Sequence, residues 1–517
     1  MAPKAATAAE KLETALDYSN VPPFWKRKNG LLLYFILTSS FFSSLASGFD
    51  GSMTNAMQLL PVWQDEFGHP TGSTLGFFGA STGIGGVIPL VFLNWLPDYL
   101  GRKWPTVIGA VIIIGSSIMQ TFSTSLSMFI GAKMILGFGT SIVQMGAPVL
   151  ITELSHPKER AIVTSLYNTS VVLGYVIGAW VTFGSIKIDG QWQWRLPTLL
   201  QAAPSLFQLA MIYFSPESPR WLVAHGRPDE ALEILIKYHG EEDPNSTLVL
   251  TEFDEIKAAI ALDSENTFTW KQFFASTPNL KRIAICTAVA VFSQSTGNLL
   301  VSNYLSPILK QAGLDSAFES TLINGMVTLW SYIISIICCF LMNTFRRRTF
   351  FLWGSGGTLI IFIVWTVGAQ QFTENGNIAA GRLVIACIFF FQLFYVIAWQ
   401  VLVVTYPLEI CTYQMRAKMW SYVLLVIYVA QIFGNYVNPI GLESIGWKYY
   451  IYLCVWIAMI WGIVYFCFPE TMGPTLEELE AIFDGPKERS QRDVEKLGIE
   501  KEEVDHEEVR VYENGKP

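Results

Sequence analysis

Residues 151–160 read ITELSHPKER, and residues 407–416, 256 positions later, read PLEICTYQMR. Each stretch follows a long apolar run, and in each a glutamate stands seven residues before an arginine. The four charged residues are Glu153, Arg160, Glu409 and Arg416. Charges placed alike at the ends of two apolar runs indicate a duplicated chain. We therefore predict two similar bundles of membrane helices.

Two further motifs repeat more weakly. Residues 98–103 (DYLGRK) correspond to 343–348 (NTFRRR), and residues 214–218 (FSPES) correspond to 468–471 (FPET). The preference for positive residues on the cytoplasmic side of a membrane would explain the arginines but not the glutamates. A role that only fixes the orientation of the protein in the membrane nevertheless stays open. We predict a charge network that bridges helix ends and closes one face of the protein in one of its states. Its members are Arg102, Glu153, Arg160, Glu217, Arg347, Glu409, Arg416 and Glu470.

The composition places the chain in a membrane. Of 517 residues, 51% are hydrophobic and 15% charged, which is too apolar for a soluble protein of this length. The net charge of -8 comes largely from the centre and the C-terminal tail, and no basic patch predicts nucleic-acid binding. The seven cysteines lie in or beside apolar runs, so we expect them to be reduced. No spacing predicts a metal site, a cofactor or a catalytic centre.

Crossing about 30 Å of hydrocarbon takes about 20 apolar residues. The sequence predicts an all-α membrane protein whose twelve transmembrane helices form two pseudo-symmetric six-helix bundles. The expected spans are 31–53, 73–96, 105–124, 127–150, 163–185, 195–215, 282–308, 320–343, 350–369, 380–405, 418–440 and 448–468.

Lysine and arginine gather in the short loops on the side of both termini, which predicts that both termini are cytoplasmic. Residues 1–25 hold no signal peptide, so we expect the first span to direct insertion. The predicted parts are an N-terminal segment, a first bundle, a cytoplasmic helical linker, a second bundle and a cytoplasmic tail. Their ranges are 1–30, 31–215, 216–281, 282–468 and 469–517.

Local signals predict helices in the linker and in the tail. Ser218-Pro219 is a cap followed by proline at the first helical position, and amphipathic runs cover 231–235 and 253–262. Residues 475–478 (TLEE) form a capping box. From Pro486 onward the tail is rich in charge, and we expect disorder.

Several motifs together resemble the sugar porter family of the major facilitator superfamily over nearly the whole chain. They are residues 98–103, 153–160, 194–197 (WRLP) with Gln201, 216–220 (PESPR) and 469–478 (PETMGPTLEE). Residues 48–51 (GFDG), 295–298 (STGN) and 406–409 (YPLE) are similar to the fungal lactose permease-like branch, which carries disaccharides and hexoses. The resemblance implies the major facilitator fold. Asn343 and Arg346 replace the family's aspartate and glycine, which weakens the charge network expected in the second half.

Asp50 and Lys133 are charges inside apolar spans, where each costs about 2.5–3.5 kcal/mol unless it is paired or useful. Both fall in the outer part of the bilayer, so they can pair. One interpretation is a static salt bridge between two helices. The resemblance favours another, in which Asp50 takes up and releases a proton while Lys133 stabilises its charged form and burial favours its neutral form. The family usually has arginine where Lys133 stands, and lysine lacks the bidentate fork.

Sugars need amide and hydroxyl partners, and aromatic rings that cover their C–H faces. Candidates lie in the fifth, seventh, tenth and eleventh spans: Asn168, Gln294, Asn298, Trp399, Tyr428, Gln431, Asn435 and Asn438. Gly297, between two of them, predicts a break in the seventh span, and steps of three, four and three place the last four on one face. For any single residue, an interhelical hydrogen bond is the alternative.

The expected function is that of a secondary active transporter, not an enzyme, which imports a mono- or disaccharide with protons by alternating access. We expect a monomer in the lipid bilayer of the plasma membrane. Ser293 and Asn303 depart from the family's paired glutamine and paired tyrosine, so the sugar cannot be carried over from the resemblance. They leave open a carrier of a non-sugar compound, such as a quinate-like acid or a secondary metabolite. A sugar sensor that does not transport and a facilitator of the same fold without proton coupling are further alternatives.

Overall fold

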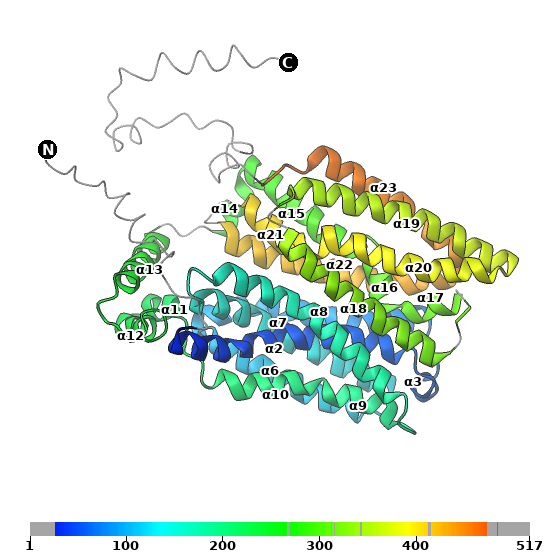
Figure 1. The fold of residues 1–517 in the computed structure, drawn as a ribbon, viewed down its shortest axis with the longest axis horizontal. Coiled ribbons are helices and arrows are strands. Elements are labelled where there is room, and N and C mark those ends of the chain that lie inside the picture. Colours follow the sequence, from blue (N-terminus) through cyan, green and yellow to red (C-terminus); the bar gives the residue numbers. More distant parts are fainter. Residues whose placement is uncertain are drawn as a thin grey trace, which may run out of the picture.

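The computed structural model describes residues 26–265, 269–311, 313–314, 316–341, 344–411, 415–472 and 483. Within these ranges every regular element is a helix. Figure 1 shows the long helices running side by side along the longest axis of the molecule, with one group of helices above the other. The predictions for residues 1–25, for Asn343 and for the tail from residue 473, including the capping box at 475–478, lie outside the described residues, apart from Phe483.

The lower group in Figure 1 is the N-terminal half. Its helices cross the bundle in alternating directions, and α9 with α10 forms one crossing that is divided at Gln201. These helices are α2 (Lys28–Met57), α4 (Gly72–Phe92), α6 (Lys103–Thr121), α7 (Leu126–Leu154), α8 (Arg160–Ser185), α9 (Trp192–Leu200) and α10 (Ala202–Ile212). Two short connecting helices are α3 (Pro61–Phe67) and α5 (Leu96–Leu100).

The C-terminal half repeats this plan. Its helices are α15 (Thr277–Ser295), α16 (Asn298–Asn303), α17 (Leu305–Gln311), α18 (Ala317–Leu341), α19 (Arg347–Asn375), α20 (Ile378–Tyr395), the π-helix η3 (Val396–Gln400), α21 (Val401–Ile410), α22 (Arg416–Ile445), the 3₁₀ turn η5 (Gly446–Lys448) and α23 (Tyr449–Cys467). The two halves meet where α4 packs along α22 and where α8 packs along α18.

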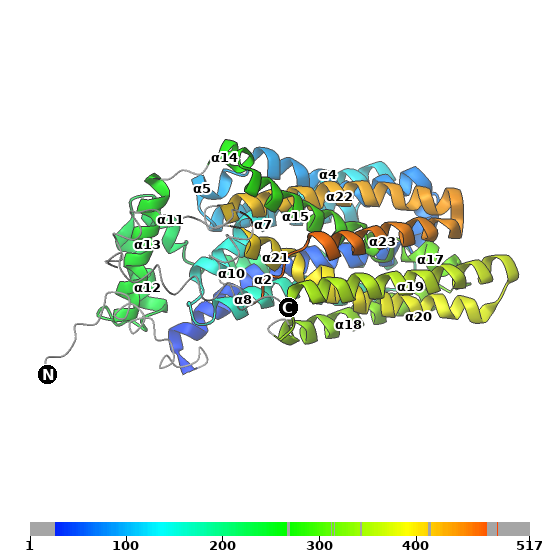
Figure 2. The ribbon, with the colours of Figure 1, turned by 90° about the horizontal axis from the view of Figure 1, so that it is seen from above.

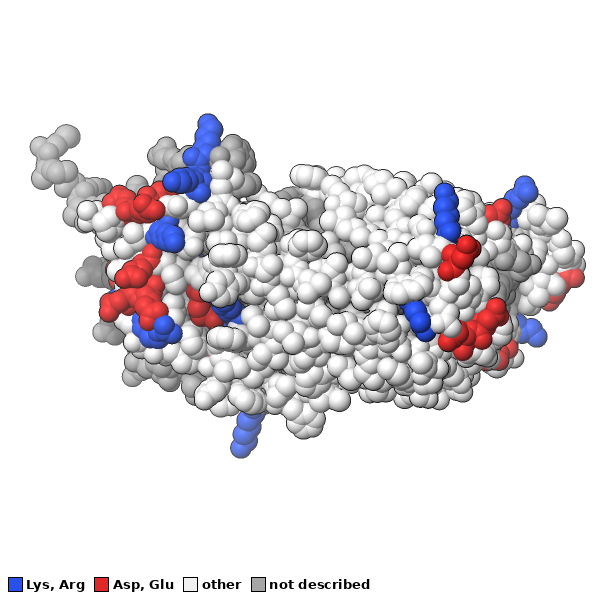
Figure 3. Space-filling model, turned by 90° about the horizontal axis from the view of Figure 1, so that it is seen from below, with Lys and Arg blue, Asp and Glu red and all other residues white. Residues whose placement is uncertain are grey.

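The twelve predicted crossings are present. Ten stretches are long and apolar enough to span a membrane. One of them, Lys418–Cys467, holds both α22 and α23, and the crossing made by α9 and α10 is additional because its kink divides it into short helices. Figure 3 shows charged side chains at both ends of the molecule and a broad uncharged belt between them. Large apolar side chains such as Phe92 and Phe466 are exposed, as expected of a protein whose surface faces lipid.

Two crossings of the C-terminal half are irregular. The predicted break at Gly297 is confirmed: α15 ends at Ser295, α16 begins at Asn298, and Gly297 has a φ of +94° that only glycine adopts without strain. The π-helix between α20 and α21 was not predicted. Such insertions place side chains outside the normal helical register and often accompany functional sites.

Three linker helices, α11 (Pro219–Ala224), α12 (Pro228–Tyr238) and α13 (Thr247–Glu265), lie beyond one end of the bundle, and α14 (Trp270–Ala275) leads into α15 (Figure 2). The predicted cap is confirmed, since the Ser218 hydroxyl accepts a hydrogen bond from the amide of Trp221. The predicted amphipathic runs lie in α12 and α13, whose apolar sides form a small core of their own. We call the end of the bundle that carries these helices the linker face, and the opposite end the distal face.

Candidate functional site

The structure brings Asp50 of α2 and Lys133 of α7 together inside the N-terminal half. Lys133 Nζ lies 3.5 Å from Asp50 Oδ1, and the two side chains are only 2% and 9% exposed. The same carboxylate oxygen accepts a hydrogen bond of 3.0 Å from Gln201 Nε2, at the kink between α9 and α10. A buried carboxylate is therefore held by three helical segments rather than by one ion pair.

Thr54 completes this group, which we call the Asp50 cluster (Asp50, Thr54, Lys133, Gln201). Lys133 Nζ donates to Thr54 Oγ1 at 2.5 Å, a shorter contact than that to Asp50, and Thr54 Oγ1 lies 3.4 Å from Asp50 Oδ1. The ammonium also lies 5.1 Å from the centre of the Phe78 ring, which favours a cation. Sequence reasoning did not select Thr54, although its position four residues after Asp50 puts both on one helix face.

The Asp50 cluster surrounds the buried carboxylate with three hydrogen-bond donors, those of Lys133, Thr54 and Gln201. Burial disfavours an isolated carboxylate, whereas the ammonium and two neutral donors favour it. Tyr175 of α8 packs on the backbone of Gly51, so the cluster lies beside the helix that carries Asn168.

Asn168 and Tyr175 are seven residues apart on α8, which places them on nearly the same side of the helix. The adjacent Tyr167 instead contacts α2, where its carbonyl oxygen accepts a hydrogen bond of 2.9 Å from Ser44. Asn168 is exposed. Its amide therefore has the freedom to meet a solute.

In the C-terminal half, Gln294 and Asn298 flank the break at Gly297. Gln294 Nε2 donates to Ser293 Oγ at 3.0 Å, and Asn298 Oδ1 accepts from Ser302 Oγ at 3.0 Å. Tyr395, the last residue before the π-helix, donates to the carbonyl oxygen of Ser293 at 3.1 Å. The break and the π-helix thus face each other, with polar groups between them.

Trp399 belongs to the π-helix but is 0% exposed. Its ring packs at 5.1 Å from Phe351 and 6.0 Å from Phe292, measured between ring centres. In this conformation it supports the wall behind the break and does not meet a solute. The predicted stacking on a sugar would require a rearrangement of these rings.

The residues predicted on one face of α22 divide between two roles. Asn435 is 1% exposed, accepts from Asn303 Nδ2 at 2.8 Å and donates to the carbonyl oxygen of Gly79 at 3.0 Å. Asn438 accepts from Tyr449 at 2.8 Å, within its own half. Tyr428 and Gln431 are partly exposed, so on this face they are the residues better placed for a solute.

Hydrogen bonds close the two halves against each other near the distal face. Asn55 Oδ1 accepts from the amide of Leu305 at 3.2 Å, and Asn55 Nδ2 donates to Asn324 at 3.0 Å. Gln58 Nε2 donates to the carbonyl oxygen of Asn303 at 3.0 Å, while Gln58 O accepts from Ser306 Oγ at 3.3 Å. These contacts define a conformation that is closed at the distal face.

A stripe of glycines on α4 allows this closure. Members recur at steps of four and three, which places them on one helix face toward α22. A Cβ at Gly76 would lie 2.7 Å from the carbonyl oxygen of Tyr436, and a Cβ at Gly83 would lie 2.9 Å from Ile432. Small residues let two membrane helices approach this closely. The stripe consists of Gly72, Gly76, Gly79, Gly83 and Gly86. Its spacing is visible in the sequence, but we did not predict a helix contact from it.

Three members of the predicted charge network, Arg102, Glu153 and Glu217, lie together on the linker face of the N-terminal half. The Glu217 carboxylate accepts from the backbone amides of Arg102 (2.9 Å) and Lys103 (3.2 Å) and so caps α6. The Arg102 side chain reaches Glu153 at 3.2 Å, and the Ser218 hydroxyl donates to the same carboxylate at 2.5 Å. A carboxylate at a helix N-terminus is stabilised by the free amides there.

The C-terminal half repeats these contacts. Glu470 accepts from the amides of Arg347 (2.9 Å) and Arg348 (3.2 Å), Arg347 pairs with Glu409 at 3.2 Å, and Thr471 donates to Glu409 at 2.5 Å. The duplicated motifs therefore fold into the same arrangement twice. Each set joins helices of its own half.

The arginines placed seven residues after the glutamates do not pair with them here. Arg160 Nη2 forms a 3.7 Å ion pair with Glu252 of α13 and contacts the carbonyl oxygen of Ser155, whereas Arg416 donates to the equivalent carbonyl oxygen, that of Cys411. The spacing places each arginine at the start of the next helix, beyond the glutamate. In the first half it reaches the linker instead.

A buried group around Glu252 fastens the linker to the bundle. His239 contacts Glu252 at 2.7 Å and the carbonyl oxygen of Leu154 at 3.1 Å, and its ring lies 5.2 Å from that of His156. Burial, together with His239 and Arg27, lowers the pKa of His156 to about 3. Burial alone would raise the pKa of Glu252, but attraction to His239 and Arg160 outweighs it and holds that pKa low. No pattern in the sequence predicted that His156 and His239 are buried together.

A second contact joins the linker to the start of α2. The Glu241 carboxylate accepts from the backbone amides of Asn29 at 3.3 Å and Gly30 at 3.1 Å. Beside it, Arg27 Nη2 contacts both oxygens of Glu159 at 2.7 Å. The first turn of α2 is thereby fastened to the linker through Glu241 and to the start of α8 through Glu159.

Comparison with known proteins agrees with this architecture. The profile of the family described as "Sugar (and other) transporter" matches residues 36–483. The sugar transporter STL1 of Saccharomyces cerevisiae is 27% identical over 89% of this chain and 82% of its own. The high-affinity glucose transporter of Kluyveromyces lactis is also 27% identical, over 89% of this chain and 87% of its own.

Among solved structures, the xylose transporter XylE from E. coli in its inward-open conformation superposes with a TM-score of 0.71 at 22% identity, covering 87% of this chain and 100% of XylE. The same TM-score, at 21% identity, is found for the proton:xylose symporter XylE bound to 6-bromo-6-deoxy-D-glucose, over 88% of this chain and 100% of XylE. These similarities concern the fold.

Proposed function

Because this chain belongs to the family of sugar (and other) transporters, the sugar porters of the major facilitator superfamily, we propose that it imports a sugar together with a proton. The protein is a multi-pass membrane transporter and not an enzyme. The observation that carries the proton coupling is the Asp50 cluster, a buried carboxylate inside the N-terminal half.

In the proposed coupling, the protonation of Asp50 controls whether α2 can move. With Asp50 ionised, Lys133, Thr54 and Gln201 hold α2, α7 and α9 together. Protonation removes the attraction between Asp50 and Lys133 and frees α2 to move. Because α2 carries Asn55 and is followed by its C-cap residue Gln58, its movement would break the distal hydrogen bonds.

The sugar would bind between the halves. Asn168 of α8, Gln294 and Asn298 at the break, and Tyr428 and Gln431 of α22 are the groups available for its hydroxyls. The names of the relatives support hexose-sized solutes, whereas a disaccharide and the lactose permease-like branch stay predictions. A transmembrane potential of 100 mV supplies about 2.3 kcal/mol per proton, enough to concentrate a solute.

We propose that the linker face is cytoplasmic and the distal face external, in the plasma membrane. The described conformation is then closed to the outside. The two charge sets on the linker face, around Arg102 and Arg347, would meet and close that side when the distal face opens. The uncharged belt would contact the lipid of the bilayer. The protein is proposed to act as a monomer.

Uptake of labelled D-glucose, D-xylose and lactose into proteoliposomes, with and without an imposed pH gradient, tests this function. Accumulation above the external concentration that requires the gradient supports it. Equilibration at the same rate with and without the gradient would leave an uncoupled facilitator.

A non-sugar carrier is the second candidate. One relative, the MFS-type transporter oryC of Aspergillus oryzae, is 26% identical over 75% of this chain and 72% of its own, and its name specifies no sugar. Of the altered positions in the seventh span, Asn303 is engaged by Asn435 and Ser293 by Tyr395 and Gln294. Competition of sugar uptake by quinate separates this candidate from the first.

A further inference from the structure

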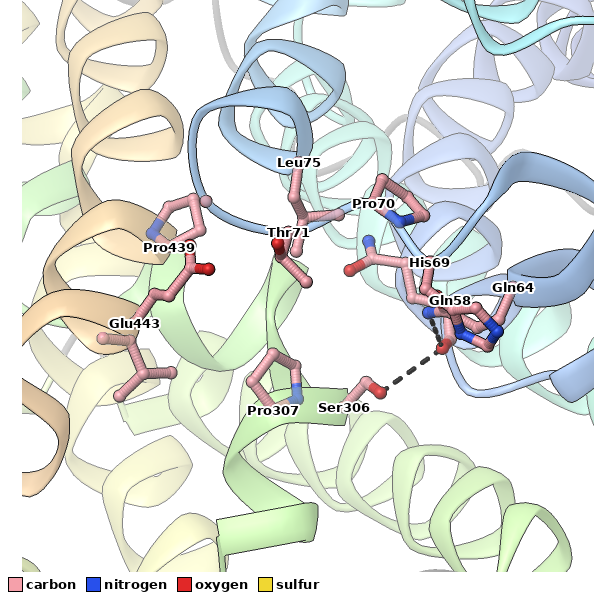
Figure 4. A pocket seen from close by; sticks show the side chains of 12 residues that line it. Gln58, Gln64, His69, Pro70, Thr71, Leu75, Ser306, Pro307, Pro439 and Glu443 are labelled. Carbon is pink, nitrogen blue, oxygen red and sulfur yellow. Dashed lines mark hydrogen bonds between the residues drawn. The ribbon is translucent and has the colours of Figure 1, made fainter.

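A pocket of about 270 Å³ lies at the distal face, outside the hydrogen bonds that close the halves (Figure 4). Gln64, His69 and Thr71 line it from the N-terminal half, and Ser306 and Glu443 from the C-terminal half. Gln58 forms part of its inner wall, where its carbonyl oxygen accepts from Gln64 at 2.8 Å and from Ser306 at 3.3 Å. We call this the distal pocket.

Polar groups in the distal pocket are available to a ligand. Thr71 is the residue before α4, but its hydroxyl makes no capping bond to that helix. Glu443 lies against Gly72, where a Cβ would meet its carboxylate, and none of the described residues forms an ion pair with it. The side-chain nitrogen of Gln64 donates to the carbonyl oxygen of Gln58, which leaves the side-chain oxygen of Gln64 to accept a hydrogen bond from a ligand.

These groups mostly accept hydrogen bonds, so the ligand must donate several. Leu75, Pro307, Pro439 and Leu442 give the pocket an apolar wall, which suits the C–H face of a ring. The carboxylate of Glu443 repels anions. The volume lies just below the roughly 300–1,000 Å³ of small-molecule sites, which limits the ligand to a small molecule.

We propose that the distal pocket is a second solute site, which binds a neutral polyhydroxylated molecule of monosaccharide size while the distal face is closed. Because both halves line it, an occupant bridges them and favours the closed arrangement. External solute then slows the return of the carrier to its outward-open state. The choice of a sugar as ligand rests on the proposed function.

The test is protection of an introduced thiol in intact cells of a host that lacks sugar transporters. His69→Cys places a reporter at the rim of the distal pocket, and a membrane-impermeant maleimide reaches it from outside. We expect D-glucose at about ten times its Kd to slow labelling about tenfold, since protection follows 1 + [L]/Kd. Glu374→Cys, also exposed but absent from the pocket lining, should label at the same rate with or without glucose.

Two further variants separate the distal pocket from the central site. Glu443→Gln and Thr71→Val, each combined with the reporter, should abolish protection while keeping the labelling rate without sugar, which also shows that the protein is folded. Gln294→Ala with Asn298→Ala should lose uptake but keep protection.

The reverse pattern, protection lost in the Gln294 and Asn298 variant and kept in Glu443→Gln, would overturn the distal site and leave the proposed function intact. Protection by choline but not by glucose would overturn the assigned ligand class. Absence of protection by any sugar in a protein that transports glucose would overturn the distal site alone.

Discussion

The side-chain amide of Asn435 donates a hydrogen bond of 3.0 Å to the backbone carbonyl oxygen of Gly79, and so fastens α22 of one half to α4 of the other. The absence of a side chain at Gly79 permits this contact, since a Cβ there would lie 2.1 Å from the Tyr304 hydroxyl. Tyr304 in turn donates to the carbonyl oxygen of Asn435 at 2.6 Å. A single methyl group at Gly79 would therefore disturb the whole contact.

Gly79→Ala should shift the protein toward a distally open conformation. Overpacking of this kind costs about 1–3 kcal/mol of stability, and it would destabilise only the distally closed conformation. Distances between spin labels at Asp65 and Ser444, measured by electron double resonance, should lengthen. Gly115→Ala on α6, where a Cβ meets no atom within 4 Å, is the matched control and should leave the distances unchanged. An unaltered distribution in Gly79→Ala would contradict the role of the glycine stripe.

Asp50→Asn should abolish accumulation against a gradient and keep exchange of sugar across the membrane. Asparagine retains the shape and accepts from Gln201 but cannot exchange a proton. The measurement is labelled-sugar uptake with an imposed pH gradient, compared with counterflow without one. Asp65→Asn, an exposed carboxylate paired with His69, is the control and should accumulate normally. Normal accumulation in Asp50→Asn would remove Asp50 from the coupling.

Lys133→Arg should be tolerated better than Lys133→Ala. Arginine keeps a cation beside Thr54 and Asp50, whereas alanine leaves the carboxylate without its ion partner, a change that costs about 3–5 kcal/mol in buried pairs unless the acid takes up a proton. Uptake by the alanine variant should then no longer vary with external pH between about 5 and 7, because Asp50 stays neutral. Equal activity and equal pH dependence in both variants would show that Lys133 does not act on Asp50.

Acidification of the linker face should loosen α12 and α13 from the bundle. The pKa of His156 is about 3 in the folded protein, below its ordinary value of about 6.5, so the docked state binds fewer protons and loses stability as pH falls below about 6.5. The low pKa of Glu252 makes its contribution persist until pH falls below the usual carboxylate range. Hydrogen exchange in residues 228–265 should therefore be faster at about pH 5 than at about pH 7.

In His156→Asn this pH difference should shrink, because asparagine keeps an acceptor for the Lys158 amide but does not titrate. Arg227→Ala is the control: its pair with Glu230 is half exposed and contributes little. A pH difference of full size in His156→Asn would assign the effect to another group.

Asn245 should not be glycosylated, although residues 245–247 (NST) match the acceptor sequence and Asn245 is exposed. The reason is the proposed cytoplasmic position of the linker. A glycosidase-sensitive mass shift that disappears in Asn245→Gln would reverse the topology, and with it the external position of the distal pocket.

Local patterns in the sequence determined much of this protein. Apolar runs of the length of a bilayer predicted the crossings, and the duplicated motifs predicted charged residues at corresponding helix ends, around Arg102 and Arg347. Gly297 predicted a break because a glycine within an apolar helix marks a position where the helix is easily interrupted. The pairing of Asp50 with Lys133 followed from depth alone, since two opposite charges at one level of a bilayer gain most by meeting.

Only the tertiary structure decided which side chains meet across helices. The depth of a residue in the bilayer does not specify how its helix is rotated. The sequence therefore did not predict that Thr54 and Gln201 contact the Asp50 and Lys133 pair, or that the Trp399 ring packs against Phe351. Arg160 met Glu252 because α13 docks beside the start of α8, which no local pattern encodes. The role of the glycine stripe likewise became clear only from the tertiary structure, in which α22 packs against it. Helical period and hydropathy are properties of one segment, whereas partners are set by the packing of several segments together.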